Sequence, residues 1–173
     1  GIIRFVIPLF PAASIFYTPF VITLSLLGII YTSLTAIRQV DLKRIIAYTS
    51  VAHMNLVLLA LFSFSTIGFL GGMFQSLSHG FVSSALFLLV GVLYDRFHNR
   101  FIQHYSGLVI KMPLFITFFL LFSLANIAFP LTSSFVGEFL ILFGIYSFSI
   151  PITFFASSGM ILGGGYSLWL LNR

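Results

Sequence analysis

Residues 126–142 read Asn-Ile-Ala-Phe-Pro-Leu-Thr-Ser-Ser-Phe-Val-Gly-Glu-Phe-Leu-Ile-Leu, and this stretch decides how the chain folds. It is almost wholly apolar, yet it holds Glu138, one of only three carboxylates in 173 residues. Pro130 has no backbone N–H to donate and its ring clashes with the preceding turn, so it predicts a helix break. The hydroxyls of residues 132–134 are able to cap the start of a new helix.

The apolar segment around this stretch, 113–149, is about 37 residues long, whereas roughly 20 residues cross a bilayer. We therefore predict a broken helix with a first half at about 113–127, an extended link at 128–133 and a second half from about 135. Glu138 then lies in the first turns of the second half, where the helix dipole favours negative charge. Half-helix ends that point into a membrane interior are a recurring device for ion sites.

The composition of the whole chain indicates an integral membrane protein. It is 60% apolar and 6% charged, whereas soluble domains carry roughly 25% charged residues. A targeting peptide would leave a soluble remainder, but here the apolar character runs from end to end. The absence of cysteine excludes disulfides, thiolate metal sites and iron–sulfur ligation within this chain. No basic patch interleaved with aromatic residues suggests a nucleic-acid partner.

The charge-free stretches predict an all-α, polytopic transmembrane bundle that forms a single membrane domain over residues 1–173. We expect about five spans, with a discontinuous helix near 127–134, and residues 1–12 as the end of an earlier span. Ser63 to Thr66 and Gly71-Gly72 mark a turn between two of them. Because the chain begins with Gly1 rather than Met, we expect a further segment upstream. The expected spans are 19–37, 45–63, 69–93, the broken 113–149, and 152–171.

The basic residues predict the orientation of the bundle. With five crossings, Arg4 alone falls near one face, and the other face receives the remaining seven. Such a bias points the basic face toward a bacterial cytoplasm or a mitochondrial matrix. The seven are Arg38, Lys43, Arg44, Arg96, Arg100, Lys111 and Arg173.

Two histidines are expected at membrane depth. His53 lies near the midpoint of the second span, and His79 lies near the middle of the third. Gln75, His79 and Ser83 are spaced i, i+4, i+8, so they form one stripe that should face other helices or a wet cavity. Histidine accepts and releases protons near neutrality, because its reference pKa is about 6.5. Together with the carboxylate of Glu138, the two histidines predict a proton route.

A structural interpretation stands beside this functional one. Polar side chains in membranes also hydrogen-bond across packed helices, at about 0.6 kcal/mol each, and His53 and His79 could do only that. Glu138 could likewise sit solvated at the far interface. Against that, an ionised residue at the bilayer centre costs about 2.5–3.5 kcal/mol on insertion scales, which favours a functional reason for keeping it there.

Four segments of the chain carry a specific resemblance to a known family. In order, they resemble signature segments of the antiporter-like membrane subunits of respiratory complex I, and the likeness covers essentially all 173 residues. Glutamate in the broken helix is typical of one of these subunits, whereas its sisters typically carry lysine there. The segments are Arg38-Gln39-Val40-Asp41-Leu42-Lys43-Arg44-Ile45-Ile46-Ala47-Tyr48-Thr49-Ser50-Val51-Ala52-His53-Met54, Ser78-His79-Gly80-Phe81-Val82-Ser83-Ser84-Ala85-Leu86-Phe87, Leu93-Tyr94-Asp95-Arg96 and Phe135-Val136-Gly137-Glu138-Phe139-Leu140-Ile141-Leu142.

The resemblance implies a proton-translocating part of the complex that couples NADH:ubiquinone electron transfer to pumping. Position by position, His53 and His79 match histidines of the family's polar axis, and Glu138 matches its distal proton site. The chain looks like the ninth to thirteenth of about fourteen family helices, preceded by the end of the eighth. The implied partners are the lipid bilayer and other membrane-arm subunits, including a chain or segment with the missing N-terminal helices.

The resemblance also implies the place of the cofactors and of the protein itself. We expect no cofactor in this chain, with FMN and iron–sulfur clusters in other subunits and ubiquinone elsewhere in the complex. The expected location is the mitochondrial inner membrane, with a bacterial plasma membrane as the other option. Two further readings stay open: a subunit of a multi-subunit cation/proton antiporter of the same fold, and a purely structural membrane subunit.

Overall fold

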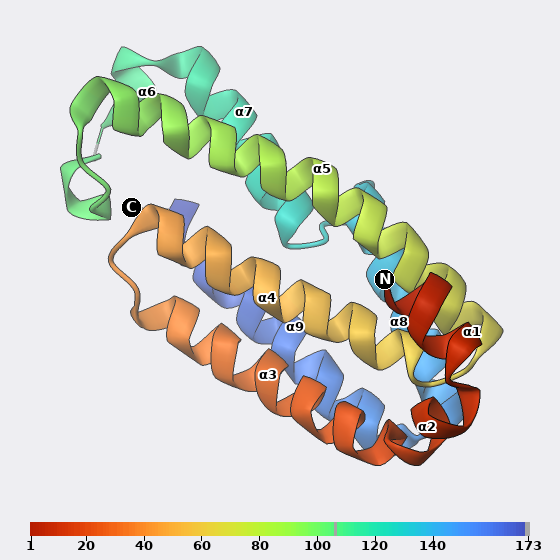
Figure 1. The fold of residues 1–173 in the computed structure, drawn as a ribbon. Helices are drawn as coiled ribbons and strands as arrows, with labels where there is room; N and C mark the ends of the chain where they lie inside the picture. Colours follow the sequence, from red (N-terminus) through yellow and green to blue (C-terminus); the bar gives the residue numbers. More distant parts are fainter. Residues whose placement is uncertain (106, 172–173) are drawn as a thin grey trace.

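The computed structural model describes residues 1–105 and 107–171, and within them the regular structure is helical apart from one isolated β-bridge. Figure 1 shows the long helices running side by side in an elongated bundle. The all-α fold expected from the sequence is therefore confirmed. In chain order the elements are the π-helix η1 (Ile2–Val6), α1 (Ile7–Leu9), α2 (Pro11–Phe16), α3 (Thr18–Arg38), α4 (Leu42–Leu61), α5 (Thr66–Phe97), the 3-10 helix η2 (Ile102–His104), α6 (Leu108–Lys111), α7 (Pro113–Asn126), α8 (Ser133–Phe148) and α9 (Ile150–Leu171).

Local chemistry explains where the long helices begin and end. Asp41 caps the start of α4 by accepting from the backbone N–H of Lys43 at 3.1 Å. Ser65 caps α5 in the same way, accepting from Gly68 N at 3.1 Å. At the other end of α5, His98 takes the left-handed conformation (φ 50°) that commonly terminates helices.

Three of the described helices, α3, α4 and α5, are long and apolar enough to cross a membrane, whereas α7 and α8 are shorter apolar helices. The helix α5 starts at Thr66, three residues before the expected 69, and it contains Gly71 and Gly72, which were expected to mark a turn. That expectation is wrong because the two glycines serve helix packing. A Cβ on Gly71 would lie 2.8 Å from the backbone nitrogen of Ile141 in α8.

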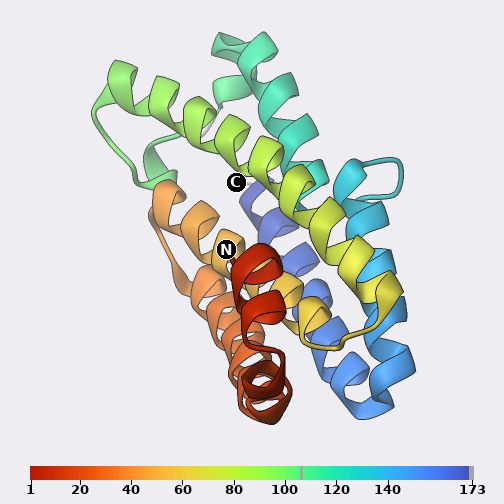
Figure 2. The same ribbon diagram turned by 45° about the vertical axis from the view of Figure 1, so that its right-hand side comes forward.

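Among the described helices, α5 and α8 make the most extensive contact, and they run antiparallel. Glycines let the two backbones approach: a Cβ on Gly137 would lie 2.4 Å from Gln75 Oε1, and one on Gly144 would lie 2.4 Å from the Gly68 backbone. The head of α8 therefore lies beside the middle of α5, while its tail lies beside the start of α5 near Gly68. Figure 2 shows α8 following the lower half of α5 in this way.

The expected break in the fourth segment is confirmed. The helix α7 ends at Asn126 and α8 begins at Ser133, and Figure 2 shows the link between them projecting as a loop. Two non-glycine residues of the link, Ala128 (φ 58°) and Leu131 (φ 83°), have left-handed backbone conformations. The expected hydroxyl cap is wrong: the N-cap residue Thr132 makes no side-chain cap bond and donates to Phe129 O at 2.7 Å.

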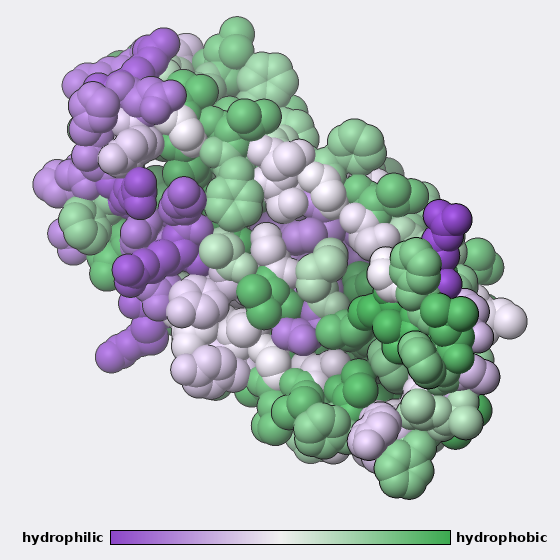
Figure 3. Space-filling view, viewed as in Figure 1, coloured by the Kyte–Doolittle hydropathy of each residue, from purple (hydrophilic) through white to green (hydrophobic). Residues whose placement is uncertain are grey.

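The loops at one end of the bundle are joined. Asp41 and Phe101 form an antiparallel β-bridge, with Leu42 N donating to Arg100 O at 3.0 Å and Ile102 N to Val40 O at 3.1 Å. This end therefore gathers the basic residues that flank the two loops, and Figure 3 shows hydrophilic side chains concentrated there. The predicted basic residue 173 lies outside the described residues.

Two apolar clusters fill the bundle on either side of mid-depth. One packs Leu42, Ile45 and Leu86 with residues of α7 toward the basic end. The other packs Leu59 and Ile141 with residues of α3 and α9, and the N-terminal helical turns rest against it through Ile2, Ile3 and Ile7. The buried polar side chains discussed next lie between these two clusters.

Candidate functional site

Glu138 lies in the interior of the bundle, 2% exposed, in the second turn of α8. The head of α8 is held against the middle of α5 by hydroxyl contacts from Ser78 to Ser133 (2.7 Å) and to Ser134 (3.0 Å). These bonds use Ser133 and Ser134, the first two residues of α8, whereas the hydroxyl of the N-cap residue Thr132 is bonded to Phe129 O. The break in the segment thus places a carboxylate in the second turn of a helix that begins inside the bundle.

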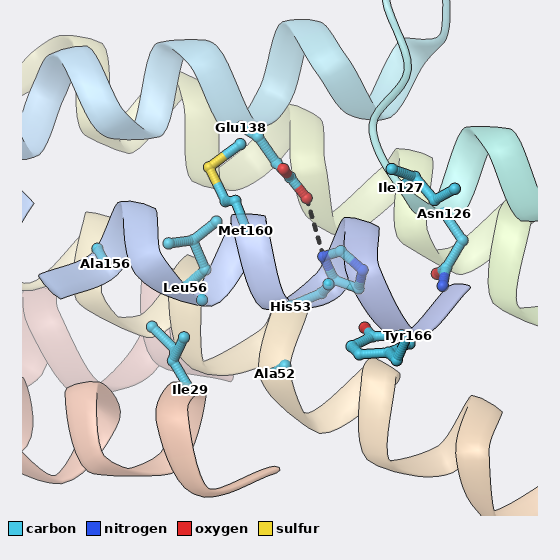
Figure 4. Close-up of a pocket in the computed structure, with 12 residues that line it drawn as sticks. Ile29, Ala52, His53, Leu56, Asn126, Ile127, Glu138, Ala156, Met160 and Tyr166 are labelled. Atoms are coloured by element: carbon cyan, nitrogen blue, oxygen red, sulfur yellow. Dashed lines mark ion pairs between the residues drawn. The ribbon is translucent and has the colours of Figure 1, made fainter. Parts of the chain in front are cut away.

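His53 is the direct partner of Glu138. Its Nδ1 lies 2.9 Å from Glu138 Oε1, and the two side chains are 13% and 3% exposed. Figure 4 shows the carboxylate of Glu138 reaching from α8 to the imidazole on α4. Sequence analysis expected both residues at mid-depth, but it did not predict that they touch.

Gln75 also reaches the carboxylate, since its Nε2 donates to Glu138 Oε1 over 3.4 Å. It is 1% exposed and comes from α5, so three helices meet at one carboxylate. The close approach of α5 and α8 at Gly137 is what brings the amide within range. In the sequence, Gln75 and His79 are four residues apart and share one face of the helix, and this spacing indicated that Gln75 faces the interior.

His79 lies one turn beyond Gln75 on α5 and is 7% exposed. Its ring centroid is 5.2 Å from that of His53, at an interplanar angle of 42°. This places the two rings in contact without a hydrogen bond between their nitrogens. The structure therefore gathers all three predicted residues, with His53 in the middle of the row from His79 to Glu138.

A cavity of about 30 Å³ adjoins the contact between His53 and Glu138. A cavity needs roughly 10–15 Å³ by this measure to hold a water molecule, so there is room for one or two. Its other polar lining residues are Asn126, the last residue of α7, and Tyr166 of α9. Both are labelled in Figure 4. Sequence reasoning missed their role, although a polar residue at the end of a half-helix is a signal that could have found Asn126.

Three buried polar atoms in the described part of the chain have no hydrogen-bond partner: Ser50 Oγ, His53 Nε2 and Gln75 Oε1. Buried groups of this kind are usually paired, because leaving one unpaired costs about 1–3 kcal/mol. The imidazole of His53 is therefore bonded to the carboxylate through one nitrogen while its other nitrogen has capacity to accept or donate a proton. Such an arrangement suits a group that exchanges protons in two directions.

The contact between His53 and Glu138 can exist in two forms that differ by the position of one proton. Either Nδ1–H donates to the carboxylate, or the carboxylic acid donates to an unprotonated Nδ1. The described residues contain no group of three or more His, Cys, Asp and Glu side chains that could hold a metal ion. What the arrangement can do chemically is bind, store and pass a proton in a region shielded from bulk water.

Comparison with known proteins places the chain among membrane subunits of one kind. The family model described as "NADH:quinone oxidoreductase/Mrp antiporter, TM" matches residues 1–163. The chain is similar to NADH-ubiquinone oxidoreductase chain 4 of Chondrus crispus, with 57% identity over all of this chain and 35% of that protein. It is also similar to NADH-quinone oxidoreductase subunit M of Rhodobacter capsulatus, with 50% identity over all of this chain and 34% of that protein.

The fold agrees with a solved structure. The chain matches 98% of its length to a chain described as "Respiratory complex I from Thermus thermophilus with bound NADH", of which it covers 36%, with a TM-score of 0.94 and 32% identity. It therefore spans about a third of the length of these relatives. On the extent of the family match, this chain belongs to the NADH:quinone oxidoreductase/Mrp antiporter transmembrane family.

Proposed function

We propose that this chain is part of a proton-translocating membrane subunit of respiratory complex I. In this proposal NADH:ubiquinone electron transfer, carried out by other subunits, drives protonation changes along His79, His53 and Glu138. The observation that supports it most directly is the 2.9 Å contact between His53 and Glu138 at the head of a half-helix inside the bundle. A carboxylate in such a place is expensive to keep, and proton relays are a common reason for keeping one.

The proposal gives each of the three residues a role. Glu138 is the terminal carrier of this segment, because α8 holds its carboxylate inside the bundle in contact with His53. His53 passes the proton, since one ring nitrogen contacts the carboxylate and the other has no partner among the described residues. His79 extends the row, and a water molecule or a rotation of one ring must bridge the two histidines, whose centroids are 5.2 Å apart.

The proposal also places the chain in a larger assembly. In this proposal the chain itself contains no redox centre. FMN and iron–sulfur clusters belong to other subunits, and ubiquinone binds elsewhere in the complex. Its partners are the other membrane-arm subunits and a chain or segment with the N-terminal helices that the longer relatives have. We place it in the mitochondrial inner membrane, with the basic face toward the matrix, in keeping with the positive-inside rule.

The decisive test is Glu138→Gln in the assembled complex. The change keeps the size of the side chain and removes its ability to carry a proton, so we expect the number of protons pumped per NADH to fall while assembly persists. Asp95→Asn is the matched control, since it neutralises an exposed carboxylate near the basic end of α5. Pumping stoichiometry and NADH:ubiquinone rate are measured in sealed vesicles. A normal stoichiometry in assembled Glu138→Gln would refute the proposed role.

A second candidate is a subunit of a multi-subunit cation/proton antiporter, because the description of the matching family names both kinds of protein. The same buried row could exchange protons against another cation without any electron transfer. Purification of the native assembly separates the two candidates. Flavin and iron–sulfur absorbance that co-purifies with the chain supports the complex I assignment, and its absence together with cation-driven proton movement supports the antiporter.

A further inference from the structure

The side-chain amide of Gln75 uses only one of its two polar atoms. Its Nε2 donates to Glu138 Oε1 over 3.4 Å, whereas its own Oε1 has no hydrogen-bond partner among the described residues. The residue is 1% exposed, so bulk water does not supply that partner. Buried polar atoms are nearly always paired, and an unpaired one calls for an explanation.

The packing of α5 against α8 leaves the amide able to rotate in place. Gln75 lies directly against Gly137, where a Cβ would stand 2.4 Å from Gln75 Oε1 and 3.0 Å from Gln75 Cα. Rotation about the terminal torsion exchanges the oxygen and the nitrogen, which are nearly the same size, and this torsion has broad, roughly twofold preferences. No partner of Oε1 in the described part of the chain holds the present orientation. Gln75 can therefore present either an N–H or a carbonyl oxygen to Glu138.

Glu138 needs different partners in its two protonation states. Among the described residues, its Oε1 contacts His53 Nδ1 at 2.9 Å and Gln75 Nε2 at 3.4 Å. An ionised carboxylate only accepts hydrogen bonds, so an N–H from each neighbour suits it. A protonated carboxyl group has one O–H to donate, and it can donate to His53 only while Nδ1 carries no proton.

The pair of His53 and Glu138 can share one proton unaided, but a second proton creates a need for another acceptor. With one proton on Nδ1 and one on the carboxyl group, the O–H no longer has an acceptor on the imidazole. Gln75 Oε1 becomes that acceptor when the amide rotates. Because O–H···O bonds are usually about 2.5–3.0 Å long, the two flexible side chains must approach by about 0.5 Å to form it.

We propose that Gln75 is a positioning residue whose amide rotates with the protonation of Glu138. Its N–H stabilises the ionised carboxylate, and its carbonyl accepts from the protonated carboxyl group when His53 Nδ1 also carries a proton. Gln75 itself neither gains nor loses a proton; it allows the pair to hold two protons in place of one. The inference rests on the proposed function, since a pair that alternates between one and two protons delivers one proton in each cycle.

Other titratable groups near the pair also respond to pH. Tyr166 of α9 lines the same cavity as Glu138, and His79 of α5 contacts the ring of His53. The residues that line this cavity from α3 and α7 carry no ionisable group. A signal that changes with pH must therefore be assigned by substitution at Gln75 and Glu138, and not by its pH alone.

The first test follows the amide by infrared difference spectroscopy of the assembled complex. Glutamine is isotopically labelled at its side-chain carbonyl, and comparison of labelled with unlabelled complex, in acid and in alkaline buffer, isolates the glutamine carbonyls that respond to pH. We expect such a band in the parent, because Gln75 Oε1 is unpaired in one state and accepts a hydrogen bond in the other. The band should disappear in Gln75→Met, which keeps an unbranched, flexible side chain but removes the amide.

Gln103→Met is the matched control, because it is the same change at an exposed glutamine in η2. The responsive band should persist in this variant and should be lost in Glu138→Gln, where no carboxyl group can be protonated. A parent complex without a responsive band overturns the inference, and so does a band that persists in Gln75→Met. Gln75→Asn keeps an amide on a side chain one methylene shorter, and it should also lose the band. This second variant serves if Gln75→Met does not assemble.

The second test measures pumping in sealed vesicles. We expect fewer protons per NADH in Gln75→Met than in Gln103→Met, because the pair can no longer hold its second proton. Equal stoichiometry in the two assembled variants would show that rotation of the amide has no part in transport.

The two tests separate failure of this inference from failure of the proposed function. If Glu138→Gln abolishes pumping while the parent shows no responsive glutamine band, the proton role stands and the rotating amide is wrong. If the band behaves as expected while Glu138→Gln pumps normally, the amide follows the proton of a carboxyl group that is not a carrier, and the proposed function fails.

Discussion

Replacing Gly137 by alanine should disturb the site without touching any titratable group. The new Cβ would lie 2.4 Å from Gln75 Oε1 and 3.0 Å from Gln75 Cα. The amide can rotate away, but the Cα belongs to the backbone of α5, and carbon atoms prefer about 3.5–4.0 Å. The helix α8 must therefore retreat from α5 by about 0.5–1.0 Å, and overpacking of this kind costs about 1–3 kcal/mol.

A retreat of this size acts on the carboxylate. Gln75 bonds to Glu138 at 3.4 Å, which is already near the limit, so that bond should be lost. Hydrogen bonds to charged groups contribute about 1.5–3 kcal/mol, and a shift near 1 Å at a reacting centre can cost about a hundredfold in rate. We expect Gly137→Ala to lower both the thermal stability of the complex and the protons pumped per NADH.

The assay compares Gly137→Ala with Gly91→Ala in the purified complex, by thermal denaturation and by pumping in sealed vesicles. Gly91 is a helical glycine of α5 whose Cβ would meet no atom within 4 Å. Alanine there should be neutral or slightly stabilising, because glycine is about 0.8–1.0 kcal/mol less favourable in a helix. Equal stability and equal pumping in the two variants would show that the close approach of α5 and α8 does not position Glu138.

Three further predictions follow from particular contacts. His53→Ala should reduce the amount of assembled complex, since breaking a buried pair costs about 3–5 kcal/mol, and equal assembly of parent and variant on native gels would contradict this. Gly159→Ala should destabilise the contact of α3 with α9, because the new Cβ would lie 2.1 Å from Ile29 Cγ2, and Ile29→Ala should suppress the defect in thermal denaturation; no suppression would rule out that clash. Asp41→Ala should lower stability by about 1 kcal/mol through loss of the cap of α4, while Asp41→Asn keeps most of it, so the same Tm for both would argue against a capping role.

The local features of the fold could be predicted from the sequence because their causes lie within a few residues. Pro130 has no N–H and Glu138 is a lone charge in an apolar run, so the break between α7 and α8 and the burial of the carboxylate were both expected. The use of the three hydroxyls was not predicted: Thr132 donates back to Phe129 O, and Ser133 bonds to Ser78, which is 55 residues away in the sequence.

The contacts of the site could not be predicted, because they depend on how distant helices pack. Gln75 is 63 residues from Glu138, and no pattern along the chain specifies that its amide reaches that carboxylate. One glycine that allows this approach, Gly71, is typical of a turn when the sequence is considered alone, yet it packs against Ile141 of α8. Asn126 and Tyr166 look unremarkable in the sequence, and only the cavity that they both line singles them out.

The glycine-lined seam between α5 and α8 has a consequence for genetics. Because Gly137 and Gly144 fit directly against a neighbouring backbone, α8 has one seating, and sliding it by a turn would carry Glu138 about 5.4 Å from its partner. Packing of these glycines therefore fixes the position of Glu138 along α5. A random-mutagenesis screen for lost energy conversion should therefore recover substitutions at Gly137 and Gly144 as often as substitutions at the ionisable residues. The glycine substitutions would act by displacing Glu138 and not by removing a proton-carrying group.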